Sequence, residues 1–163
     1  MIEYNKFMNN KTKENLIKLT QKEADKAIIK GNPPFGAVLT DRRGNVIVTA
    51  HNTQISSLDV TAHAEINLLR KVCKKLKTKN LSKYLLFSNA ESCSMCASAA
   101  IKAGIRSIYY GAPHEPSMDP NISIFELAKR AKKKIYIHPN ILKEECVTQI
   151  KKGRETISRS NRF

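Results

Sequence analysis

The sequence predicts an α/β fold whose mixed five-stranded sheet is covered by helices on both faces. Two observations predict it: five segments carry apolar residues at helical spacing, and five short apolar runs lie among polar turns. The first two runs follow each other across a tight turn, which indicates an antiparallel hairpin. The later runs alternate with helices, and strands joined through helices are expected to be parallel. This alternation is typical of a layered α/β domain.

The bounds of the predicted elements follow from these patterns and from the turn residues between them. The first helix ends at Gly31-Asn32-Pro33-Pro34, and the hairpin turns at Asp41-Arg42-Arg43-Gly44-Asn45. We expect one domain over residues 1–153 and a basic C-terminal tail over residues 154–163. The predicted helices cover residues 12–29, 64–76, 96–103, 125–131 and 141–150, and the predicted strands cover residues 37–39, 46–48, 84–87, 108–110 and 135–137.

The composition places the chain among globular proteins. Its 163 residues are 41% hydrophobic and 26% charged, a balance that excludes collagen-like and disordered chains. No apolar run approaches the roughly 20 residues that span a bilayer, which excludes an integral membrane protein. The polar N-terminus lacks the charged-then-apolar order of a secretory signal peptide, so we expect a cytoplasmic protein without a membrane partner.

The net charge of +15 permits an anionic partner such as RNA. The excess is uneven, because residues 128–163 carry 11 basic and 3 acidic side chains, whereas residues 31–127 carry 11 and 7. The C-terminal part therefore supplies much of the positive field. A lysine-rich composition that serves solubility alone explains the same charge, since net charge predicts attraction without specificity.

Four residues carry the candidate chemistry: His63, Glu65, Cys93 and Cys96. One imidazole and two thiolates make three zinc ligands, the number in a catalytic site that leaves the fourth position for water. In a reducing compartment, a Cys-x-x-Cys pair favours metal binding or catalysis over a disulfide. The segment with His63 and the segment with Cys93 and Cys96 each lie near the predicted start of a helix. At such a position the helix dipole favours the thiolate form of cysteine that metal binding requires.

Glu65 lies two residues from His63, near enough to reach a metal-bound water without being a ligand itself. Zinc lowers the pKa of such a water to about 7, so the carboxylate accepts a proton and the hydroxide attacks a carbon that bears an exocyclic amine. Glu65 then passes protons in turn to the ring nitrogen and to the leaving amine. The expected reaction is a hydrolytic deamination that releases ammonia.

The alternative interpretation is a closed structural zinc site. Its fourth ligand would come from Cys73, Cys146 or His51. This alternative gives Glu65 no role, and the apolar neighbours of both cysteines are typical of ordinary buried thiols. The sequence therefore favours the open, catalytic site.

The combination of His-x-Glu with Cys-x-x-Cys resembles the cytidine/deoxycytidylate deaminase superfamily. Within it, the chain is similar to the purine-acting branch of guanine deaminases and bacterial tRNA adenosine deaminases, from about residue 14 to residue 150. The resemblance implies a three-layer α/β/α cytidine-deaminase-like fold, zinc held by His63, Cys93 and Cys96, and Glu65 as the proton shuttle. The matching stretches are Pro34-Phe35-Gly36-Ala37-Val38, His51-Asn52, Tyr110-Gly111-Ala112 and residues 61–65 and 91–96.

One departure from the family lies directly before the first cysteine ligand. The family has proline there, and this sequence has Ser92. Proline presets the backbone at a helix start, but serine is also favoured at helix N-termini. We therefore expect the metal site to be kept.

The same resemblance implies a set of substrate-binding residues. Asn52 would hydrogen-bond the purine ring, and Phe35 and the backbone of Ala64 would lie beside the base. Glu115 or Asp119, in the loop after the fourth strand, would read a purine amino group. Each has a plainer structural explanation: an asparagine that caps a turn, a phenylalanine that fills the core, and loop acids that are solvated.

We expect zinc-dependent deamination of a purine base or nucleoside, most like that of guanine deaminase, because residues 34–38 and 61–76 look most like that enzyme. The runner-up is an adenosine deaminase acting on a tRNA anticodon loop, which the basic C-terminal part and residues 141–146 favour. A third hypothesis, an inactive deaminase fold that binds RNA, leaves Glu65 without a role.

The resemblance also has consequences for assembly. Both enzyme families form homodimers, so a homodimer is expected by analogy. In guanine deaminases of this kind the C-terminal segment can cover the partner's pocket, and Phe163 would then serve as an aromatic lid. A disordered basic tail is the alternative for this segment.

Overall fold

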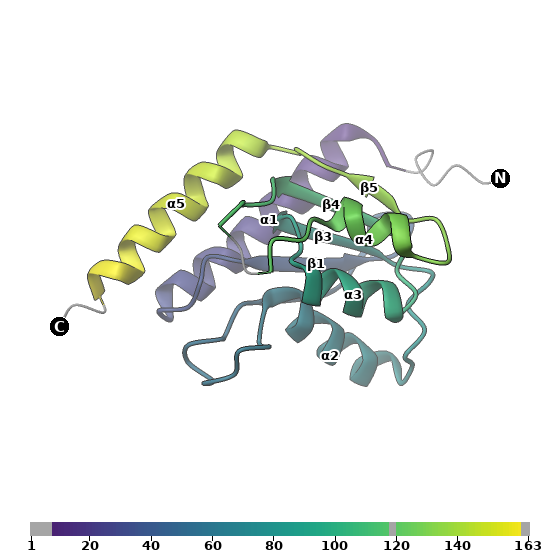
Figure 1. Ribbon diagram of the computed structural model, residues 1–163, viewed down its shortest axis with the longest axis horizontal. Coiled ribbons are helices and arrows are strands. Elements are labelled where there is room, and N and C mark those ends of the chain that lie inside the picture. Colours follow the sequence, from purple (N-terminus) through teal and green to yellow (C-terminus); the bar gives the residue numbers. More distant parts are fainter. Residues whose placement is uncertain (1–7, 118–119, 161–163) are drawn as a thin grey trace.

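The computed structural model describes residues 8–117 and 120–160, which form helices and strands in the predicted order (Figure 1). The predicted bounds agree with the observed ones to within a few residues, except at the last helix. The helices are α1 (Asn10–Ile29), α2 (Ala64–Leu76), α3 (Ser94–Lys102), α4 (Ile124–Arg130) and α5 (Lys143–Ser160), and the strands are β1 (Gly36–Thr40), β2 (Val46–His51), β3 (Leu85–Ala90), β4 (Ser107–Ala112) and β5 (Tyr136–His138).

The five strands form one mixed sheet in the order β2-β1-β3-β4-β5. Strand β1 pairs antiparallel with β2 and with β3, whereas β3, β4 and β5 pair parallel. Strands β2 and β3, which α2 joins, run in the same direction on either side of β1. The predicted hairpin and the predicted parallel crossovers are therefore both confirmed.

Helices cover both faces of the sheet, as the sequence predicts. Helices α1 and α5 pack together on one face, and α2, α3 and α4 lie in succession on the other (Figure 1). Neighbouring residues of β3 serve different cores: Leu86 belongs to the cluster under α2 and α3, and Phe87 belongs to the cluster under α1 and α5. Strands β1 and β3 are buried on both faces, which explains their continuous apolar runs.

The last helix is longer than predicted. The sequence indicates an end at Ile150, but α5 continues to Ser160 and crosses the boundary predicted at residue 153. Cys146, Ile150 and Gly153 are buried at helical spacing, so one apolar face extends past the predicted end. Position 153 requires glycine, because a Cβ there would lie 2.7 Å from side-chain atoms of Ile28 and Pro34. In the described part of the chain, no helix is long and apolar enough to cross a membrane.

Gly36→Ala is expected to destabilise the fold. A Cβ at this position would collide with the Thr20 carbonyl oxygen and lie 2.7 Å from the Ala24 nitrogen, both in the backbone of α1. Because backbone cannot move aside cheaply, we expect the free energy of unfolding to fall by about 3 kcal/mol in urea titration. Gly31→Ala is the control, since it has open space and only a positive φ of 71° to strain. Equal losses in the two variants would contradict the steric argument.

Candidate active site

Two helix N-termini bring the predicted metal ligands together. His63 is the N-cap of α2, Cys93 is the N-cap of α3, and Cys96 lies in the first turn of α3. The Nδ1 atom of His63 lies 3.6 Å from the Sγ of Cys93 and 3.5 Å from the Sγ of Cys96. Residues that are 30 and more positions apart in the sequence therefore share one small volume.

The geometry of this group fits zinc. Zinc bonds of about 2.0 Å to nitrogen and 2.3 Å to sulfur, in tetrahedral arrangement, place the two ligand atoms about 3.6 Å apart. The three ligand atoms lie within 4.8 Å of one another, and no other His, Cys, Asp or Glu of residues 8–117 and 120–160 joins the group. The closed site with a fourth protein ligand is therefore wrong for the described residues, and the open site is the one that forms.

The electrostatics of the group also suit a cation. A hydrogen bond from Cys96, together with the contact to His63, lowers the pKa of Cys93 to about 4. The pKa of Cys96 is raised because its thiol donates to Cys93 and is buried. The pair thus shares one negative charge when no cation is present, and a divalent ion would favour loss of the second proton.

Glu65 lies in the first turn of α2 and is only 7% exposed. Burial raises the pKa of its carboxyl group, and the negative charge on Cys93 adds to the rise. A carboxyl group whose pKa is raised holds a proton more readily, which suits it to accept a proton and then donate it. Ser92, where the family has proline, is fully buried in front of the ligand Cys93.

A cavity of about 320 Å³ opens beside the ligand group. This volume suits a small heterocycle, since ligand sites of that size enclose most of a small molecule. Its walls come from the carboxyl ends of β3 and β4, from the starts of β1 and α3, and from α5. The lining residues include Phe35, His63, Glu65, Asn89, Glu91, Cys93, Met95, Pro113, Glu115, Ile150 and Arg154.

The predicted substrate-binding residues are only partly brought together. Phe35 and Glu115 line the cavity, whereas Asn52 and Ala64 are fully buried and are not among the lining residues. The Asn52 side chain caps a turn: its Oδ1 accepts from the Gln54 backbone N–H at 2.9 Å. Asp119 and Phe163 lie outside the described residues. Phe35 and Glu115 are thus the predicted substrate residues that the cavity supports.

Arg154 reaches the cavity from α5 and is not among the site residues that the sequence predicts. Its guanidinium donates to both carboxylate oxygens of Glu115, at 2.9 and 2.7 Å, and lies 5.8 Å from the centre of the Phe35 ring. Both bonds come from one guanidinium nitrogen, Nη1, so this ion pair tethers the Glu115 carboxylate at the cavity mouth. The helical spacing of apolar residues beyond Ile150 was the signal that could have placed Arg154 on a helix.

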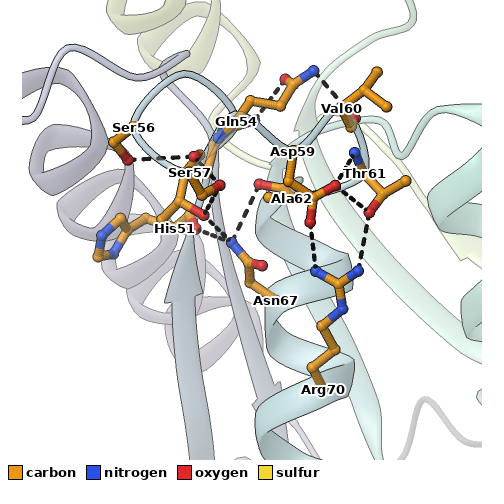
Figure 2. A network of polar contacts seen from close by, with 12 residues as sticks. His51, Gln54, Ser56, Ser57, Asp59, Val60, Thr61, Ala62, Asn67 and Arg70 are labelled. Atoms are coloured by element: carbon orange, nitrogen blue, oxygen red, sulfur yellow. Dashed lines mark hydrogen bonds and ion pairs between the residues drawn. The ribbon is translucent and has the colours of Figure 1, made fainter.

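The loop that leads to His63, residues 52–62, is held by polar contacts rather than by regular secondary structure (Figure 2). Asn67 on α2 donates from its side-chain amide to the backbone oxygens of His51 and Ala62, at 3.0 and 3.2 Å. These bonds satisfy loop carbonyls that the sheet does not reach and fix the loop against α2. The same network includes Thr53, Gln54, Asp59, Thr61 and Arg70.

The fold and the site together define a protein with an open three-ligand metal centre and a buried carboxyl group beside it. Residues 10–112 match the model of the cytidine and deoxycytidylate deaminase zinc-binding region. This match covers most of the chain and includes all three candidate ligands and Glu65. The chain therefore belongs to the cytidine and deoxycytidylate deaminase family, and its cofactor is zinc.

Two curated relatives and one solved structure illustrate the similarity. A tRNA-specific adenosine deaminase of Aquifex aeolicus is 35% identical over 100 residues, which are 61% of this chain and 66% of the relative, just under two thirds of its length. A guanine deaminase of Bacillus subtilis is 34% identical over 105 residues, 62% of this chain and 67% of the relative. A solved tRNA:A34 deaminase is 31% identical, with a TM-score of 0.74 over 83% of this chain and 98% of that one.

Loss of either cysteine ligand is expected to remove zinc. Cys93→Ser or Cys96→Ser replaces a thiolate by a hydroxyl, a poor zinc ligand, and the zinc content measured by plasma emission should fall from about one ion per chain to below about 0.2. Cys73→Ser is the matched control, because Cys73 is half-buried and outside the ligand group. If Cys73→Ser lost as much zinc as the other two, the ligand assignment would be overturned.

Proposed function

We propose that this chain is a zinc-dependent hydrolase that deaminates a purine base or nucleoside, with free guanine as the leading substrate. One observation carries the proposal: two members of an open His, Cys, Cys group, His63 and Cys93, line the same small cavity as the buried Glu65. This arrangement offers a place for an attacking water, a group to move its proton, and walls that hold a planar ring. The similarity to a guanine deaminase supports the choice of substrate class.

The residues of the chain have distinct parts in such a reaction. Zinc bound by the three ligands would supply a Lewis acid that lowers the pKa of a water molecule. The carboxylate of Glu65 would accept a proton from the attacking water in a site shielded from solvent and pass it to a ring nitrogen. It would then accept the remaining proton of the added hydroxyl and pass that second proton to the leaving amine. Burial makes the proton easier to hold, since it raises the pKa of Glu65.

The mouth of the cavity is suited to orienting the ring. Phe35 offers an apolar face, and Glu115 offers an acceptor for a purine amino group, as the sequence predicts. Arg154 holds the Glu115 carboxylate in place and adds a donor of its own. Acceptor and donor side by side complement the mixed hydrogen-bonding edge of a purine.

The second candidate function is deamination of an adenosine in a tRNA anticodon loop. The similarity to tRNA deaminases supports it. The exposed lysines and arginines of α5 support it as well, because the helix that carries Arg154 to the cavity also carries Lys151, Lys152 and Arg159. A base in a single-stranded loop can be splayed out into the same cavity.

A homodimer is part of the proposal, and so is a cytoplasmic location, which rests on the sequence alone. The loop before α2 supports the dimer, because Leu58 and Val60 are 95% and 77% exposed there. Val60 also lines the cavity. Large apolar side chains gathered at the rim of a site are typical of a surface that another protein covers.

A substrate panel tests the proposal. Zinc-loaded protein is given free guanine, adenine, guanosine, adenosine, cytosine, cytidine and an anticodon stem-loop RNA, and ammonia release is measured. We expect turnover of free guanine and a loss of at least about 100-fold in Glu65→Gln, which keeps the shape of the side chain but cannot accept a proton. Turnover of the RNA alone would favour the second candidate. Equal ammonia release by Glu65→Gln and the parent protein would contradict the assigned proton shuttle.

Arg154→Ala is expected to weaken substrate binding. Without the guanidinium, Glu115 loses its fixed orientation at the cavity mouth, so KM should rise about fivefold while kcat changes little. Arg159→Ala is the matched control, because it removes one positive charge from the same helix without touching the cavity. A similar rise in KM for both variants would point to the general positive field instead of the Arg154–Glu115 pair.

A further inference from the structure

Glu91 is a second buried acid in the cavity wall, and the deamination chemistry leaves it without a part. It follows β3 directly, lies two residues before the ligand Cys93, and is 6% exposed. It lines the cavity that Glu65 also lines. A buried carboxylate is costly unless its oxygens accept hydrogen bonds, so its partners indicate its purpose.

Three neutral donors engage the two oxygens of Glu91. Its Oε2 accepts from the Tyr110 hydroxyl at 2.8 Å and from the His114 backbone N–H at 3.3 Å. Its Oε1 accepts from the Ile124 backbone N–H at 2.9 Å. The pKa of Tyr110 is raised by burial and by this hydrogen bond, which keeps its hydroxyl a donor. Both oxygens act as acceptors, as in a carboxylate.

The two backbone donors stand at the two ends of one segment. His114 lies just after β4, and Ile124 is the first residue of α4. The segment between β4 and α4 supplies Pro113, Glu115 and Pro120 to the cavity wall. One side chain therefore holds both ends of the wall segment that carries Glu115.

We infer that Glu91 is a positioning residue for deamination: its carboxylate clamps His114 and Ile124, and thereby fixes Glu115 and its neighbours against the substrate. This inference rests on the proposed function. Both oxygens are required, because the amide nitrogen of a glutamine in the same place would face a donor and could not accept its hydrogen bond. The expected consequence of breaking the clamp is weaker substrate binding with the chemical step preserved.

Glu91→Gln and Tyr110→Phe separate this role from a merely structural one. Tyr110→Phe loses only the bond from its own hydroxyl, and Tyr110 lies in the core and not in the cavity wall. Glu91→Gln presents an amide nitrogen to the backbone N–H of either His114 or Ile124, and so loses a bond at one end of the wall segment. With the substrate that the parent protein turns over, we expect Glu91→Gln to raise KM about tenfold and to change kcat less than about twofold. Tyr110→Phe should leave KM unchanged, and both variants should keep their zinc.

The inference is overturned if Glu91→Gln leaves KM unchanged, or if both variants raise KM equally.

Amide hydrogen exchange of the parent protein tests the clamp without any substitution and without turnover. We expect the His114 and Ile124 amides to be strongly protected at neutral pH. Exchange at the rate of free peptide would overturn the clamp even if Glu91→Gln failed to fold. Absence of ammonia release from every substrate would contradict the proposed function instead, and would leave the exchange result standing.

Discussion

The convergence of two helix N-termini on one metal position is the constraint on which the rest of the structure depends. His63 and Cys93 occupy the N-cap positions of α2 and α3, and neither side chain makes a capping hydrogen bond. By contrast, Asn9 and Ser123 cap α1 and α4 in the ordinary way. Because a good cap contributes about 1 kcal/mol, the metal-free fold forgoes roughly that amount at each ligand. Packing of α2 and α3 on the same sheet face offsets this cost.

The sheet topology makes this convergence possible. Strands β2 and β3 run in the same direction, so the segments that leave them emerge at the same edge of the sheet. Strand β1 separates them, and its first residue, Gly36, donates its N–H to the Asn89 side chain at 3.0 Å. That bond joins the start of β1 to the end of β3 in the cavity wall. The metal centre and the cavity therefore both form at the end of the sheet where β2 and β3 finish and β1 begins.

The sequence predicts this arrangement well where local pattern and chemistry coincide. Apolar periodicity located all ten elements, and the residue types at 63, 65, 93 and 96 indicated the metal centre, because few other reactions need that set. The cavity rim was less predictable. The charged residues around Ile150 and Gly153 indicate a tail that includes Arg154. Helix α5 continues through this segment instead, and Gly153 packs there against α1 and Pro34. Such contacts between distant segments have no local signal.

The cavity contains two buried acids, and their surroundings divide the work between them. Glu91 accepts hydrogen bonds from three donors, two of them backbone N–H groups at the ends of the wall segment, so its carboxylate serves to hold the wall. Glu65 has a raised pKa, because burial and the nearby Cys93 charge penalise its carboxylate, and this suits it to taking up a proton. A site that transfers protons inside a rigid cavity uses one acid that binds and releases the proton and another that holds the cavity wall in place. The segment 91–96 joins the two functions, since the clamp and two zinc ligands lie within six consecutive residues.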